Sequence, residues 1–188
     1  MLKTKKGNVF SVIIIFIVLS CSGVEKQQDK PLKKVSINMV THGQATDPFW
    51  SVVSNGAKDA AKELGIDFYY QSPQNFDMIA MSQIIDAVVS TNPDGIIVSV
   101  PDVAALKKSI LAASKKNIPI IVINAGSEIM EEVDILTYVG QSEYEAGMKA
   151  AKELIKYNIT TALCVNHEIG NISLDKREQG FRKVLKEN

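Results

Sequence analysis

The chain lacks an excess of charge of either sign, because 21 Lys and Arg residues balance 21 Asp and Glu residues. Three of the lysines lie within the first six residues, and without them 18 basic residues face 21 acidic ones. A slightly acidic chain of this kind argues against nucleic acid or an acidic membrane surface as the partner. The apolar content of 46% is ordinary for a globular core, so the compositional extremes are excluded as well.

Motifs for nucleotide binding and for covalent catalysis are also missing. The segment THGQATDPFW lacks the G-x-G-x-x-G spacing, and the chain has neither a P-loop nor a G-x-S-x-G elbow. Cys164 lies in an apolar run where a small buried hydrophobe is expected, and His42 and His167 have no carboxylate placed to orient them. His42, His167 and Glu168 could meet as metal ligands, but their spacing is not diagnostic. We expect no cofactor, no metal and no enzymatic activity.

A long hydrophobic run is absent too. The longest, residues 9–19, has 11 residues and is broken only by Ser11, which is about half of the ~20 needed to span a bilayer. With the basic residues 1–8 before it, the run is typical of a secretory signal peptide, predicted as residues 1–20. Its end, Val-Leu-Ser-Cys, resembles the bacterial lipobox, which predicts acylation of Cys21.

The polar residues 21–34 indicate a lipidated cysteine and a flexible tether. The chain is therefore expected in the cell envelope, in the periplasm or at the outer membrane face, attached to the membrane through its lipid anchor only. The alternatives are a cysteine that merely follows a signal peptide and an uncleaved span. Lipidation of Cys21 would leave Cys164 without a disulfide partner in the chain.

From residue 35 onward, short apolar runs alternate with longer helical patterns, as in βαβ units with a parallel sheet. Strands are predicted at residues 35–40, 66–71, 95–100, 119–124, 136–140 and 161–166. Helices are predicted after the N-caps Asp47, Asp77, Asp102 and Ser142, and a last one begins near Ser173. Ligands of doubly wound sheets bind at the carboxyl ends of the strands. The loops 41–48, 99–102, 124–127 and 167–173 are therefore the candidate site.

Four residues near these loops invite a binding interpretation. Trp50 falls outside the apolar stripe of its helix and could pack on a sugar ring, whereas Phe49 lies on the stripe and is equally well explained as core. Asp47 can cap the helix and also accept hydrogen bonds from hydroxyl groups. Arg177 lies on the apolar stripe of the last helix, which favours a position in the cleft, with a solvated or salt-bridged surface arginine as the alternative.

The chain from residue 35 to its end resembles the periplasmic sugar-binding proteins of ABC importers, the group of the ribose- and galactose-binding proteins. The resemblance rests on DPFW, NGAKDAAKELG, NPDGIIVS, NIPIIVINAG, YVGQSEYEAGMKAAKEL and KREQGF, in this order. It implies an α/β, periplasmic-binding-protein-like fold of two flavodoxin-like, doubly wound parallel-sheet lobes that hold a monosaccharide or a related small polar ligand between them. It also implies the ligand contacts, with aromatic stacking by Phe49 and Trp50 and polar contacts from Asp47, Asn124, Arg177, Asn171 and Ser173.

Two departures from the family pattern qualify these expectations. Many relatives have Asp-Arg after the fourth strand where this chain has Asn124-Ala125, so the identity of the sugar does not carry over. Family members are also much longer. We expect a first lobe at residues 35–140 and an incomplete second lobe at 141–188.

The predicted function is that of the substrate-binding lipoprotein of a sugar importer, with a permease in the inner membrane as its partner. The alternatives are a receptor for an autoinducer or polyol that signals to a membrane sensor, and a secreted hydrolase, for which no nucleophile or carboxylate pair is found. The same fold also serves in lac-repressor-type transcription factors, but the signal sequence argues against that role.

Overall fold

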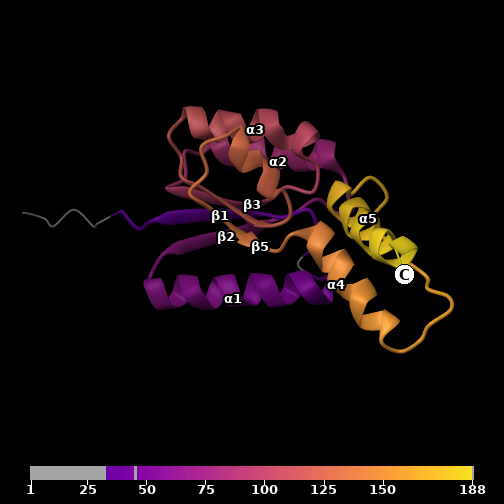
Figure 1. Ribbon diagram of the computed structural model, residues 1–188. Coiled ribbons are helices and arrows are strands. Elements are labelled where there is room, and N and C mark those ends of the chain that lie inside the picture. Colours follow the sequence, from indigo (N-terminus) through magenta and orange to yellow (C-terminus); the bar gives the residue numbers. More distant parts are fainter. Residues whose placement is uncertain (1–32, 45, 188) are drawn as a thin grey trace, which may run out of the picture. The chain divides into compact units, whose positions relative to one another are not determined.

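Five parallel strands form one sheet in the order β2-β1-β3-β4-β5 (Figure 1). The structure, a computed structural model, describes residues 33–44 and 46–187. The predicted signal peptide, Cys21 and the tether up to residue 32 lie outside the described residues. The strands are β1 (Ser36–Val40), β2 (Asp67–Gln71), β3 (Gly95–Ser99), β4 (Ile120–Asn124) and β5 (Thr137–Gly140), and each agrees with its predicted range within one residue.

The helices begin at the predicted caps. They are α1 (Pro48–Leu64), α2 (Met78–Ser90), α3 (Val103–Lys115), α4 (Glu143–Ile155) and α5 (Ile172–Glu187), with a short 3₁₀ helix η1 (Ser127–Glu131). The side chains of Asp47, Asp77, Asp102 and Ser142 each accept a backbone N–H of the first turn, which satisfies donors that a helix leaves unpaired. α1 ends at Gly65, whose φ of 67° places it in the left-handed region.

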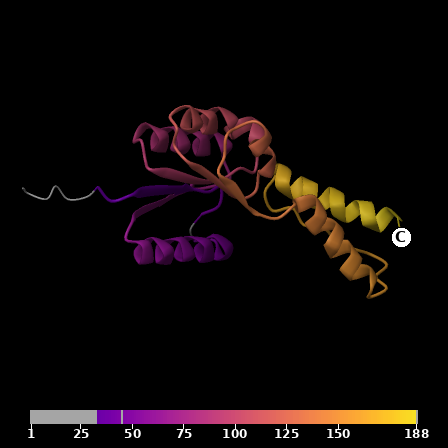
Figure 2. The ribbon, with the colours of Figure 1, turned by 60° about the vertical axis from the view of Figure 1, so that its left-hand side comes forward.

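The two faces of the sheet are covered unequally. Helices α2 and α3 pack on one face, and the main core lies between them and the alternating residues Val40, Ile96, Val98, Ile120 and Val122. Helix α1 alone lies against the other face (Figures 1 and 2). An apolar trough of about 510 Å³ remains open between α1 and this face.

The open trough explains one wrong expectation. Val52 and Leu64 have the three-and-four spacing that predicts the buried stripe of this helix, but they are 72% and 71% exposed. The apolar stripe of α1 is wider than the surface that the sheet offers it, and Leu64 instead lines the trough. Parallel sheets are normally covered on both faces, so this face is unusual for its class.

Helices α4 and α5 pack directly against each other beyond the sheet. A Cβ atom on Gly147 would lie 1.9 Å from the carbonyl oxygen of Arg177, and one on Gly180 would lie 2.0 Å from that of Tyr144. Each helix therefore places a glycine against the backbone of the other. This close approach fixes where the first turn of α5 lies relative to the start of α4.

The predicted sixth strand is wrong. Residues 161–166 have no strand pairing, and Leu163 and Val165 are 86% and 75% exposed. A strand needs the backbone groups of a neighbour, and no described strand lies beside this segment to supply them. The expectation that Cys164 is buried fails for the same reason, because its side chain is exposed.

The strand order places a switch point between β1 and β3. The chain leaves β1 toward β2 on one side and returns to β3 on the other, so the loops after β1 and β3 diverge at the carboxyl edge. The predicted α/β class, with a doubly wound parallel sheet in the first lobe, is confirmed. No helix in the described ranges has both the length and the apolarity needed to cross a bilayer.

Candidate ligand-binding site

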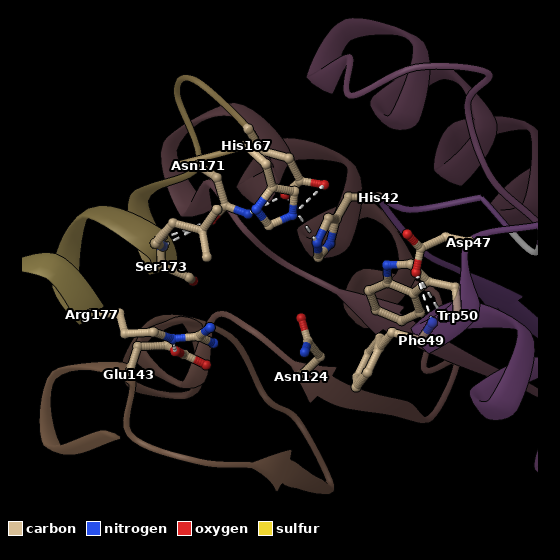
Figure 3. Close-up of a pocket in the computed structure, with 12 residues that line it drawn as sticks. His42, Asp47, Phe49, Trp50, Asn124, Glu143, His167, Asn171, Ser173 and Arg177 are labelled. Atoms are coloured by element: carbon tan, nitrogen blue, oxygen red, sulfur yellow. Dashed lines mark hydrogen bonds and ion pairs between the residues drawn. The ribbon is translucent and has the colours of Figure 1, made fainter. Parts of the chain in front are cut away.

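A pocket of about 270 Å³ lies at the carboxyl edge of the sheet (Figure 3). It is lined by all seven residues predicted to contact the ligand: Asp47, Phe49, Trp50, Asn124, Asn171, Ser173 and Arg177. It is also lined by His42, Glu143, His167, Glu168 and Leu174. Side chains from the loop after β1 and the start of α1 face those from the starts of α4 and α5 across it (Figure 3). The volume is at the small end for ligand sites, which suits a ligand of one ring.

The aromatic wall differs from its prediction. Trp50, expected outside the core, is only 5% exposed and packs edge-on against His42 and Phe49, with centroid distances of 5.0 and 5.1 Å. Its indole also covers Gly43, where a Cβ would lie 1.8 Å from Nε1. Phe49, by contrast, is 54% exposed. Phe49 is therefore the aromatic side chain with a free surface at the pocket, and Trp50 supports the wall.

Asp47 belongs to the same wall. One carboxylate oxygen, Oδ1, accepts the N–H groups of Phe49 and Trp50 at 2.9 and 3.3 Å. The second oxygen takes no part in this cap. The arrangement leaves the carboxylate able to cap the helix and to accept a further hydrogen bond at the pocket.

The rear of the pocket is built around the buried imidazole of His42. The Ser99 Oγ accepts the backbone N–H of His42 at 3.0 Å and lies 2.8 Å from its Nδ1. This bond ties the loop after β1 to the end of β3, across the switch point. Burial lowers the pKa of His42 to about 4, although the carboxylate of Glu168 opposes the shift, so the ring is neutral at pH 7.

Among the described residues no carboxylate lies within hydrogen-bond distance of either histidine, as predicted, but Glu168 lies near both. Glu168 Oε2 lies 3.8 Å from Nε2 of His42, and Glu168 Oε1 lies 4.0 Å from Nε2 of His167. The three side chains thus meet, as the metal hypothesis required. Within residues 33–44 and 46–187, however, no group of His, Cys, Asp and Glu has an arrangement that could hold a metal ion.

Ser99, His42 and Glu168 have the residue types of a catalytic triad, but their geometry does not support nucleophilic attack. Ser99 is completely buried, and its Oγ already accepts a backbone N–H. A His with a pKa of about 4 is a weak base at neutral pH. The cluster therefore serves to position the pocket wall.

The opposite wall carries an ion pair. Arg177 Nε donates to Glu143 Oε2 at 2.5 Å, and the Glu143 side chain is 7% exposed while that of Arg177 is 46% exposed. Arg177 therefore lines the pocket and is also salt-bridged, and its contact with a ligand stays a prediction. The crossing at Gly147 and Gly180 brings these two side chains together.

Asn171 and Asn124 hold structural roles at the pocket. Asn171 is 3% exposed, its Oδ1 accepts the N–H groups of Ser173 and Leu174, and its Nδ2 donates to Glu168 at 2.7 Å. Asn124 adopts a φ of 63°, and its carbonyl accepts the Tyr138 hydroxyl at 2.7 Å. These contacts fix both backbones. Contact of either side chain with a ligand stays a prediction.

Five lining residues were not among the predicted ligand contacts, and two of them, Glu143 and Glu168, carry carboxylates. Glu143 follows the predicted cap Ser142, where an acidic residue is common because it interacts favourably with the first turn of the helix. Glu168 lies inside the predicted loop 167–173, so the sequence placed it at the carboxyl edge of the sheet. The sequence did not show which residues it contacts there. Only the fold shows that both carboxylates face the same pocket.

Fold and site together define a ligand-binding lobe of the doubly wound α/β class. The sequence matches the family described as periplasmic binding protein domain over residues 37–188. The chain therefore belongs to this family, whose members bind substrates rather than transform them and are located outside the cytoplasm. No curated protein matches the chain by sequence.

Solved structures agree with this assignment. A periplasmic sugar-binding protein of an ABC sugar transporter from Legionella pneumophila is 30% identical, with a TM-score of 0.78 over 82% of this chain and 57% of that chain. A carbohydrate transporter protein from Acidothermus cellulolyticus, in complex with myo-inositol, is 32% identical, with a TM-score of 0.77 over 82% and 53%. XylFII is 28% identical, with a TM-score of 0.72 over 83% and 57%. This chain spans little more than half the length of these proteins.

Proposed function

We propose that the chain is the substrate-binding lipoprotein of an ABC-type sugar importer. It captures a simple sugar in the cleft between two lobes and passes it to a permease in the inner membrane. The observation that carries the proposal is the pocket itself, where all seven residues selected from the sequence meet. The similar proteins from Legionella pneumophila and Acidothermus cellulolyticus, described as sugar and carbohydrate transporter components, support it.

The chemistry of the pocket suits a polyhydroxylated ring. Phe49 offers an exposed aromatic face, on which the C–H groups of a sugar ring can pack. The free oxygen of Asp47, the amide of Asn124 and the guanidinium of Arg177 offer acceptors and donors for hydroxyl groups. In this proposal Asn171 and Ser173 add polar contacts from the start of α5.

The division into lobes is part of the proposal. Residues 35–140 form the first lobe and 141–188 the beginning of the second, so both sides of the cleft contact the sugar. If an intact protein binds at about 1 μM, which is about −8 kcal/mol, and each lobe supplies half, the first lobe alone retains about −4 kcal/mol, or about 1 mM. The 188-residue chain adds only the beginning of the second lobe to this, so we expect it to bind more weakly than an intact protein, near the millimolar level.

Calorimetry tests the proposal. The chain is titrated with monosaccharides and cyclic polyols, and so is a version extended to the length of the matched structures. We expect millimolar binding by the first and micromolar binding by the second. Micromolar binding by the 188-residue chain would refute the two-lobe account, and absence of binding by both versions would refute the function.

A matched pair of variants tests the aromatic wall. Phe49→Ala should weaken sugar binding about tenfold, because it removes the exposed ring at the pocket. Tyr157→Ala, which removes an aromatic ring that is 76% exposed outside the pocket, should leave the affinity unchanged. Equal effects of the two substitutions would contradict the assignment of Phe49.

A second candidate function is a receptor for an autoinducer or polyol that signals to a membrane sensor. One similar structure holds myo-inositol, a cyclic polyol, and another is a complex of XylFII with LytSN. The two functions differ in the partner. Stimulation of permease-dependent uptake supports the importer, whereas binding to a sensor without uptake supports the receptor.

A further inference from the structure

The negative and positive charges of the ionisable side chains in the pocket do not balance. Three carboxylates line it, those of Asp47, Glu143 and Glu168, against the single guanidinium of Arg177. The other two ionisable groups are imidazoles. The end of β4, Asn124-Ala125, adds no charge. At neutral pH the lining therefore carries more negative than positive charge.

The one guanidinium is already paired. Arg177 donates to Glu143, and this carboxylate is more buried than its partner. Lys176, next to Arg177 in the sequence and outside the pocket lining, is bonded to Glu128. Neither cation is free to neutralise a second carboxylate.

Two pocket carboxylates, Asp47 and Glu168, have no lysine or arginine partner among the described residues. Oδ1 of Asp47 caps α1, whereas Glu168 caps no helix, so Glu168 is the carboxylate considered for a ligand cation. Its side chain is 18% exposed, and Oε2 accepts the neutral amide of Asn171. Among the described residues, the groups within ion-pair distance of Glu168 are the imidazoles of His42 and His167. His42 is 5% exposed and, being buried, remains neutral; its Nε2 points toward Glu168 from beyond hydrogen-bond distance. A carboxylate that is 18% exposed and has no lysine or arginine beside it favours a ligand that brings positive charge.

We propose that the ligand of this pocket is a sugar or polyol bearing a cationic amino group, which Glu168 receives, and that anionic sugars are excluded. The inference rests on the proposed function, because the hydroxyl groups and the ring are held as described above. A charge-assisted hydrogen bond is about twice as strong as a neutral one, so the amino group should improve affinity at least tenfold.

The experiment compares matched ligands on the same protein. The chain is titrated by calorimetry with D-glucose and D-glucosamine, D-galactose and D-galactosamine, and D-galacturonate. We expect an amino sugar to bind at least tenfold more tightly than its neutral counterpart, with a preference that falls at high salt, and no detectable binding of galacturonate. This comparison needs no variant, so it decides the proposal even if a substitution disturbs folding.

Two variants identify the carboxylate. Glu168→Gln should bring the amino sugar and the neutral sugar to affinities within about twofold. Glu131→Gln removes an equal charge from an exposed position on η1 outside the pocket and should retain the tenfold preference.

Each result has one meaning. Neutral sugars that bind as tightly as amino sugars would overturn this inference and leave the proposed function standing. A preference that survives Glu168→Gln in a folded protein would overturn the role of Glu168. If no sugar of either kind binds to the chain or to its extended version, the proposed function fails and this inference fails with it.

Discussion

The buried imidazole of His42 should make the stability of the fold depend on pH in a specific window. Burial lowers the pKa of His42 to about 4 in the native state, from an ordinary value of about 6.5 in the unfolded chain. Between these values the unfolded chain holds a proton on this residue that the native chain does not. Stability therefore falls as the pH decreases through 6.5, and the loss is complete near pH 4.

The magnitude follows from the same shift. One pKa unit corresponds to about 1.4 kcal/mol, and at pH 5 the unfolded imidazole is almost fully protonated while the native one is almost neutral. The native state should therefore lose about 2 kcal/mol between pH 7.5 and pH 5. Stopping at pH 5 keeps the titration of most carboxylates out of the measurement.

Urea unfolding at several pH values measures the effect. His42→Gln removes the titrating group, so the variant should lose about 2 kcal/mol less than the parent over this range. If His42→Gln and the parent show the same slope, the reasoning from burial is wrong.

Three further predictions concern other parts of the chain. Cys21→Ser should move the protein from the membrane fraction to the soluble fraction, and equal membrane retention would favour an uncleaved span. Trp50, the only tryptophan, contacts both His42 and Phe49, so ligand binding should change its fluorescence. Binding without a spectral change would contradict contact of the ligand with this aromatic wall. Gly180→Ala should lower the free energy of unfolding by about 1–3 kcal/mol in urea, because its Cβ would meet a backbone oxygen of α4. Gly56→Ala, in open space on α1, should instead be neutral or stabilise the protein by up to about 1 kcal/mol, and equal losses for both glycine variants would exclude the helix contact as the cause.

Local patterns were enough to place most elements. The five strands and the caps Asp47, Asp77, Asp102 and Ser142 depend on residues that are neighbours in the sequence, such as a carboxylate beside the first turn it caps. The topology rule for doubly wound sheets then selected the correct loops, because the carboxyl ends of parallel strands share an edge. Seven lining residues of the pocket followed from these steps and the family resemblance.

The failures share a cause. Residues 161–166 have the composition of a strand, but a strand forms only where another supplies its hydrogen bonds. Val52 and Leu64 follow the helical period, but whether they are buried depends on how much of the sheet face is covered. Periodicity predicts which side of an element is apolar and not whether a partner is present.

The sequence by itself determined the fold class, the order of its elements and the edge at which a ligand would bind, because these follow from periodicity, capping and chain topology. Only the tertiary structure decided which aromatic ring is exposed and which charges face each other. Trp50 is buried because the loop residues His42 and Gly43 pack on it, which leaves Phe49 as the free surface. Glu168 lies beside His42 although 126 positions separate them, and a charge so distant in the chain acquires its environment only when the chain is folded.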